Sequence, residues 1–180
     1  MPSYVAFLRA INLGARRKFP QDDIRACVES LGCTGVETHI NTGNVLLTTG
    51  IRSRAKVEAA LEEAFLADRG FEVPTIAFSL AELGSMVDDA DEVAAALDAP
   101  VRGHYVTLLK DEPSEDVVEA VTALEYDGER AAVRGRAVHL VLAKPYSEAQ
   151  LSNAKLEKLL GVATTRNVTV IRALAAKWTD

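Results

Sequence analysis

The sequence predicts an α+β protein built from two similar halves, each with an antiparallel sheet. Segments with strand and helix periodicity follow one another as β-α-β-β-α-β over about the first 80 residues. The order β-α-β-β-α recurs after a break at Pro100, and each half has a pair of strands around a glycine, Gly43 or Gly135. This split β-α-β order is typical of the ferredoxin-like arrangement. We therefore expect two ferredoxin-like halves and a C-terminal helix.

The first half begins with a short apolar segment, residues 4–11, which predicts a buried strand. A polar loop, residues 12–20, follows it. The next apolar side chains recur at i, i+3, i+4 and i+7, the spacing of one helix face, and Gly32 then stops the helix. These side chains are Ile24, Cys27, Val28 and Leu31.

A hairpin follows this helix. Side chains alternate in polarity over residues 36–41, which predicts a half-buried strand, and residues 45–49 predict its partner. Gly43 and Asn44 lie between the two segments. Glycine at the first central position of a turn favours type II′, so we expect a tight turn here.

A helix and an edge strand complete the first half. Ser53 is the expected N-cap of a helix over residues 53–67. The strand that follows, residues 73–78, contains Pro74, which lacks an N–H group and therefore places the strand at an edge of the sheet.

The second half repeats this order without an obvious final strand. Residues 166–177 combine helical spacing with a β-branched run, so a helix and a partial strand both remain open there. We expect a first half over residues 1–80, an acidic connecting helix over 81–100 and a second half over 101–180. The predicted elements are a helix over 80–98, strands over 104–109, 130–134 and 137–142, and helices over 115–124 and 148–160.

The composition excludes several classes of protein. Twenty-six acidic residues outnumber 20 Lys and Arg residues, for a net charge of −6, which argues against a dedicated DNA-binding protein. No apolar run approaches the roughly 20 residues that span a bilayer, and no secretory signal follows Met1. Two cysteines do not make a disulfide framework. We expect a cytoplasmic protein with no membrane partner.

The sequence also lacks the common catalytic, nucleotide-binding and metal-binding motifs. It identifies no catalytic residue, no cofactor and no metal site, and leaves open whether the protein is an enzyme. Cys27 and Cys33 are expected to be core thiols. His39, His104 and His139 all fall in predicted strands; His139 is expected on a face of its hairpin, and a meeting of His39 with His104 stays open.

Positive charge is concentrated in the loop that follows the first strand. Arg9, Arg16, Arg17 and Lys18 lie within ten residues that include no acidic side chain. Charge segregated in this way creates a local field that the net charge hides, and the amide of Asn12 adds donors and an acceptor. The loop is therefore a candidate anion site. The alternative is a mobile basic loop in which Arg9 forms a structural ion pair.

A second candidate lies near the C-terminus. Thr164 or Thr165 is expected to cap the last helix, which would put Arg166 in its first turn, with Asn167 beside it. The helix dipole disfavours a cation at that end. An arginine in this position indicates a partner, which is either an acidic side chain or an anionic ligand.

Several motifs resemble the bacterial family called domain of unknown function 1697. They are Tyr4-Val5-Ala6-Phe7-Leu8-Arg9-Ala10-Ile11-Asn12-Leu13-Gly14, Lys18, Ile40-Asn41-Thr42-Gly43-Asn44-Val45, Asn153-Ala154, Leu156-Glu157, Leu160-Gly161-Val162 and Thr164-Thr165-Arg166-Asn167. The resemblance implies two ferredoxin-like halves and supplies no reaction. The polar residues that the family repeats are Arg9, Asn12, Lys18, Gly43, Asn44, Arg166 and Asn167.

Together these observations predict a binding site for a small anion that carries phosphate or carboxylate. This hypothesis needs the two basic segments to converge. One alternative is a nucleic-acid-binding module, which the lack of aromatic residues in the strand over 45–49 disfavours. The other is a non-catalytic interaction protein that forms a homodimer through exposed sheet edges. The expected ligand-binding residues are Arg9, Asn12, Lys18, Asn44, Arg166 and Asn167.

Overall fold

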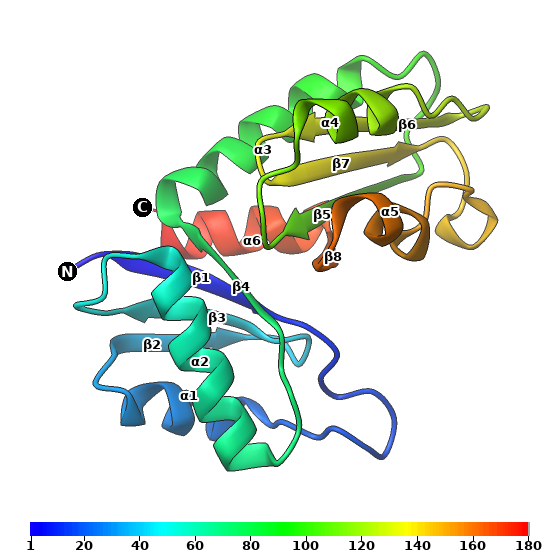
Figure 1. Cartoon of the computed structure of the whole chain (residues 1–180). Coiled ribbons are helices and arrows are strands. Elements are labelled where there is room, and N and C mark those ends of the chain that lie inside the picture. Colours follow the sequence, from blue (N-terminus) through cyan, green and yellow to red (C-terminus); the bar gives the residue numbers. More distant parts are fainter. Residues whose placement is uncertain (180) are drawn as a thin grey trace. The chain divides into compact units, whose positions relative to one another are not determined.

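The chain folds into two compact units, Met1–Glu82 and Leu83–Asp180, which we call the first and the second half. The computed structural model describes residues 1–179. Each half contains a four-stranded antiparallel sheet with helices packed against it (Figure 1). The predicted α+β class, with the β-α-β-β-α-β order in both halves and a C-terminal helix, is confirmed.

The strands of the first half lie in the order β2-β3-β1-β4, so the two most apolar strands are central. Two helices cover one face of the sheet and enclose its aromatic core, where the rings of Phe19 and Phe65 meet edge to face at 5.1 Å. Ser53 caps the second helix by accepting a hydrogen bond from the backbone N–H of Lys56, as predicted. The elements are β1 (Ser3–Leu8), α1 (Gln21–Ser30), β2 (Thr34–His39), β3 (Asn44–Thr48), α2 (Arg54–Arg69) and β4 (Thr75–Ser79).

The connection between β2 and β3 differs from the predicted tight turn. His39 pairs with Asn44, so four residues, 40–43, form the loop, and Gly43 is the last of them. Gly43 has a φ of +78°, and a Cβ atom on it would lie 2.7 Å from Cβ of Leu8. The glycine is needed because the loop packs against the end of β1, which the local sequence does not reveal.

Strand β4 lies at an edge of the sheet, as Pro74 predicts, and three glutamates seal that edge. The backbone N–H of Thr75 donates to Glu62 at 2.8 Å, and that of Ala77 donates to Glu58 at 2.8 Å. The N–H of Ser79 donates to Glu82 at 2.7 Å. Backbone groups that an added strand would need are therefore already hydrogen-bonded to side chains.

The second half has the same topology, in the strand order β6-β7-β5-β8. The sequence left open whether residues 166–177 form a helix or a partial strand. In the structure, residues 166 and 167 end the final strand, β8, and the residues after them form helix α6. Within the described residues, no helix is both long and apolar enough to cross a membrane. The elements are α3 (Leu80–Ala95), β5 (Gly103–Leu109), α4 (Glu115–Thr122), β6 (Glu129–Arg134), β7 (Ala137–Leu142), a single 3-10 turn (Tyr146–Glu148), α5 (Asn153–Leu160), β8 (Ala163–Asn167) and α6 (Val168–Trp178).

The two faces of the second sheet are covered differently. Helices α4 and α5 pack on one face over a core rich in leucine and valine. On the other face, Val93 of α3 packs against Ala132 of β6 and Val141 of β7. Three buried polar side chains, His104, His139 and Arg166, lie on this second face.

Candidate functional site

The loop of residues 9–20, which we call the basic loop, has a backbone held by one asparagine. The side-chain amide nitrogen of Asn12 donates to the carbonyl oxygens of Phe19 at 3.0 Å and Asn41 at 2.8 Å, and its oxygen accepts from the N–H of Phe19 at 2.8 Å. The N–H of Asn12 also donates to the carbonyl of Arg17. Asn12 has a φ of +55°, a conformation that asparagine tolerates better than most residues. These bonds hold both ends of the segment 12–19 together.

Arg17 also holds the basic loop in place. Its guanidinium donates to the carbonyl oxygens of Ala10 and Glu72, and it stacks over the ring of Phe71 at 4.7 Å from the centroid. The side chain therefore links the basic loop to the segment before β4. Because its donors contact backbone carbonyls, Arg17 acts as a structural residue.

Arg9 lies just beyond the end of β1 and is half-buried. The sequence predicted a strand through residue 11, which would have put this charge inside a central strand, whereas β1 ends at Leu8. The backbone N–H of Arg9 donates to the carbonyl of Pro74 at 2.9 Å. Arg9 therefore lies at the end of the sheet from which the basic loop emerges.

Two cations of the basic loop are exposed, Arg16 and Lys18. Among residues 1–179, neither has an ion-pair partner. Leu13, between the two anchored ends, is 61% exposed. The loop therefore presents positive charge to solvent from a backbone that is closed by hydrogen bonds.

Asn44 starts β3 at this same end of the sheet and is fully buried. Its side-chain nitrogen donates to the carbonyl of His39 at 2.9 Å and to the hydroxyl of Thr42 at 3.1 Å. The amide closes the four-residue loop of the hairpin. In this conformation Asn44 shapes the end of the sheet on which the basic loop sits.

In the second half, the predicted helix cap is wrong. Thr164, Thr165 and Arg166 lie in β8, and Asn167 caps α6 by accepting from the N–H of Thr169 at 2.8 Å. Arg166 is therefore a strand residue that precedes the helix cap, and it does not lie in the first helical turn as expected. The short segment forms a strand because it pairs with the central strand β5.

Arg166 is 8% exposed, and burial lowers its pKa to about 10, so the guanidinium stays charged at neutral pH. It donates to the hydroxyl of Thr164 at 2.9 Å and to the carbonyl of Thr165 at 3.1 Å. Asn167 is exposed beside it. These two expected ligand-binding residues are adjacent in β8.

The structure thus brings Arg9, Asn12, Lys18 and Asn44 to one end of the first sheet. Arg166 and Asn167 form a separate pair in the second half. The convergence of the two groups stays a prediction.

Sequence reasoning missed one polar pair. Nε2 of His104 lies 3.1 Å from Nδ1 of His139, and the two side chains are buried on central strands β5 and β7. The pairing register sets His104 opposite Val141 and His139 opposite Val106, so both imidazoles share one face. The signal that could have found the pair is the fold itself, which makes β5 and β7 neighbours.

The cysteines are free and buried, as expected for core thiols. Burial raises the pKa of Cys27, with a contribution from Asp68, and burial also raises the pKa of Cys33. Both thiols are therefore protonated at neutral pH and are poor nucleophiles. Within the described part of the chain, no group of three or more His, Cys, Asp or Glu side chains is arranged to hold a metal ion.

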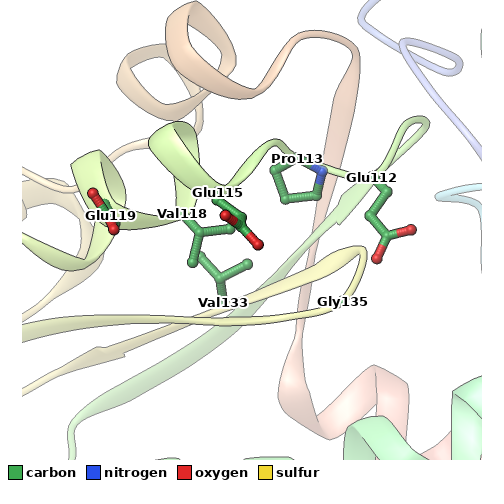
Figure 2. Close-up of a pocket in the computed structure, with 7 residues that line it drawn as sticks. All are labelled: Glu112, Pro113, Glu115, Val118, Glu119, Val133 and Gly135. Atoms are coloured by element: carbon green, nitrogen blue, oxygen red, sulfur yellow. The ribbon is translucent and has the colours of Figure 1, made fainter.

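A surface pocket of about 420 Å³ lies over α4 and the β6–β7 hairpin. Figure 2 shows Val118 and Val133 facing one another in it, with the carboxylates of Glu112, Glu115 and Glu119 around them. We call this the acidic pocket. Its charge is opposite to that of the basic loop, so it offers nothing to an anion.

Comparison with known proteins places the fold. No curated protein matches the chain. A solved structure, that of the conserved bacterial protein SP0830 from Streptococcus pneumoniae, is similar to it with a TM-score of 0.75 and 22% identity, over 97% of each chain. A family model described as "Protein of unknown function (DUF1697)" matches residues 1–139. The chain therefore belongs to the DUF1697 family, as the motifs around Arg9 and Asn44 indicated.

Proposed function

We propose that the protein binds a small anion, bearing phosphate or carboxylate, at the end of the first sheet that carries the basic loop. One observation supports this proposal above the others: the loop backbone is closed by Asn12 and Arg17, yet Arg16 and Lys18 project from it without a carboxylate partner in residues 1–179. Cations held on an ordered backbone lose little conformational entropy when a ligand binds.

Several other cations of the chain are paired with carboxylates. Arg69 pairs with Asp23 at 3.0 Å, and Arg134 pairs with Glu92 at 2.8 Å. Lys144 contacts the buried carboxylate of Glu129 at 3.1 Å. In an acidic protein, where carboxylates are plentiful, cations without such a partner are candidates for contact with a ligand.

We further propose that Arg9 contributes to binding this anion, that Arg166 and Asn167 contribute to anion binding in the second half, and that the protein acts in the cytoplasm. Arg9 supports this because it begins the basic loop. Arg166 supports it because a buried guanidinium that remains charged at neutral pH favours an anion as its neighbour.

Thermal unfolding with inorganic phosphate or citrate, at constant ionic strength, tests the proposal. A ligand that binds only the folded state raises the melting temperature, and the rise grows with the logarithm of ligand concentration above the dissociation constant. We expect a rise for the parent protein and none for Arg16→Gln/Lys18→Gln. The matched control is Arg52→Gln/Lys56→Gln, which removes two exposed cations from the same half and should keep the rise.

The absence of any rise in the parent, with both anions at millimolar concentration, would remove the proposal. A rise that the control pair abolishes equally would reduce it to nonspecific charge attraction. The participation of Arg9 and Arg166 is tested separately by calorimetry on Arg9→Gln and Arg166→Gln. A loss of affinity in either variant supports the participation of that arginine, and an unchanged affinity contradicts it.

A further inference from the structure

The paired imidazoles of His104 and His139 lie at the centre of the second sheet, between its two central strands. His139 is fully buried and His104 is 6% exposed. Only one hydrogen bond joins them, between Nε2 of His104 and Nδ1 of His139 at 3.1 Å. The other ring nitrogen of His139, Nε2, is buried and has no hydrogen-bond partner.

The neutral form is the only one that this environment accommodates. If Nδ1 of His139 donates the hydrogen bond to His104, Nε2 of His139 is an acceptor without a donor. If Nδ1 accepts the hydrogen bond instead, Nε2 carries an N–H group without an acceptor. Either arrangement leaves one neutral polar atom unsatisfied. A further proton would place a full positive charge on one of two adjoining buried imidazoles, with an apolar cluster of Val93, Ala132 and Val141 on the same face.

The charged groups around the pair also oppose its protonation. Arg134 of β6 helps to lower the pKa of His139, and Arg172 of α6 helps to lower the pKa of His104. Arg166 of β8 lies in the same row of the sheet, because Val106 has His139 opposite it on one side and Arg166 on the other. Three cations therefore share this face with the two imidazoles.

Three acidic groups of α3 lie beside two of those cations. Asp91 bonds to Arg172 at 2.5 Å, and Glu92 bonds to Arg134 at 2.8 Å. Asp89 lies 3.9 Å from Arg134. Asp91 favours the protonated form of His104, but burial and Arg172 outweigh it, and the pKa of His104 falls to about 4. Burial, His104 and Arg134 lower the pKa of His139 to about 4 as well.

We propose that the paired imidazoles of His104 and His139 are an acid-sensitive lock that keeps α3 and α6 on the second sheet. The lock holds while both rings are neutral and share one proton between them. One added proton buries a cation, a second would set two cationic N–H donors 3.1 Å apart, and opening of this face lets water reach both rings. This inference is independent of the proposed anion site.

The direction of the pH effect follows from linkage. In the unfolded chain both imidazoles titrate near 6.5, whereas in the folded protein they titrate near 4. Between these values the unfolded state binds more protons, so stability is fully present above pH 6.5 and is lost as the pH falls toward 4. Between pH 6.5 and pH 5 each imidazole lowers the folding equilibrium constant roughly tenfold.

Two readouts test the lock directly. The chain has three histidines, so the imidazole proton resonances of all three can be followed by NMR, with His39→Gln identifying the third. The single tryptophan, Trp178, is buried in α6 and reports by fluorescence on whether that helix leaves the sheet. We expect its emission to shift to longer wavelength, reversibly, below pH 5.

The matched variant is His104→Gln/His139→Asn. A glutamine amide reaches the position of Nε2 and an asparagine amide that of Nδ1, so one hydrogen bond between the strands can be kept while both titrating groups are removed. We expect this variant to retain its tryptophan emission at the pH at which the parent shifts. His39→Gln, which removes a histidine of the first half, should behave as the parent.

Imidazoles of His104 and His139 that titrate near 6.5 in the folded parent would overturn the proposal. So would a double variant whose emission shifts at the same pH as that of the parent. If the double variant does not fold, the NMR titration of the parent decides alone, because it needs no substitution.

Discussion

The basic loop of the first half and the β5–α4 loop of the second half occupy the same place in two copies of one fold, and they differ in length, charge and anchoring. The first spans residues 9–20 and contains four cations and no acid. The second spans residues 110–114, reads Lys-Asp-Glu-Pro-Ser and borders the acidic pocket. The strand order in the two halves is the same. The fold therefore determines where these loops emerge, and the loops carry whatever differs in function.

The side chains that anchor loops lie at different places in the two halves. Asn12 and Arg17 hold the basic loop, whereas Glu129 accepts from the N–H groups of Gln150 and Leu151 and holds the segment between β7 and α5. The first half has thus fixed its β1–α1 loop, where the second half has fixed the connection on the far side of the hairpin. The predictions below test whether this anchoring is what distinguishes the basic loop.

The largest effect is expected from Phe19→Ala. Phe19 is fully buried, packs on Phe65 and supplies the two backbone groups that Asn12 binds, whereas the second-half loop has no aromatic anchor. Loss of a buried phenylalanine costs about 3–5 kcal/mol of unfolding free energy, which urea denaturation measures. Phe71→Ala, at a partly buried ring of the same half, should cost less. Equal losses would show that Phe19 is no special anchor.

An intermediate effect is expected at Asn12. Asn12→Gly removes three side-chain hydrogen bonds but tolerates the positive φ, so it should cost roughly 1–3 kcal/mol. Asn12→Ala should cost about 1 kcal/mol more, because alanine is strained in that conformation. Denaturation of both variants separates the two contributions. A glycine variant as stable as the parent would mean that the amide does not hold the loop.

The smallest change in stability is expected at the exposed charges of the two loops. Lys18→Gln in the basic loop and Glu115→Gln in the acidic pocket should each change the unfolding free energy by about 0.5 kcal/mol or less. Their effects on phosphate binding should differ, since only Lys18→Gln removes a cation from the proposed site. Calorimetric titration with phosphate checks this, and a loss of binding in Glu115→Gln would contradict the assignment to the basic loop.

Much of the fold could be predicted because hydrophobic periodicity reflects burial directly. The buried stripe of Ile24, Cys27 and Val28 on α1, the cap at Ser53 and the edge position of β4 beside Pro74 are all local signals, whereas Leu31, predicted on the same stripe, lies after the helix and is exposed. Strand β8 was not predictable in this way. Its five residues acquire their conformation by pairing with β5, and the β-branched run after it is helical because Asn167 caps α6 and Ile171 packs inward.

The site could be predicted only in part, for a related reason. The cations of the basic loop are visible as a cluster in the sequence, but the contacts that close the loop join Asn12 to Phe19 and Asn41, and Arg17 to Glu72. The histidine pair depends on the register of β5 against β7. Residues that meet only through tertiary pairing leave no periodic signal in the chain.

The three glutamates that bind the backbone N–H groups of β4 have a consequence for misfolding. Two of them, Glu58 and Glu62, belong to α2, so the shield over this edge exists only while that helix is folded in place. Fraying of α2 would remove core packing. The same event would expose the backbone N–H groups of β4, to which a strand of another molecule could pair. Resistance of this half to fibril growth is therefore tied to the integrity of a neighbouring helix rather than to the strand's own sequence.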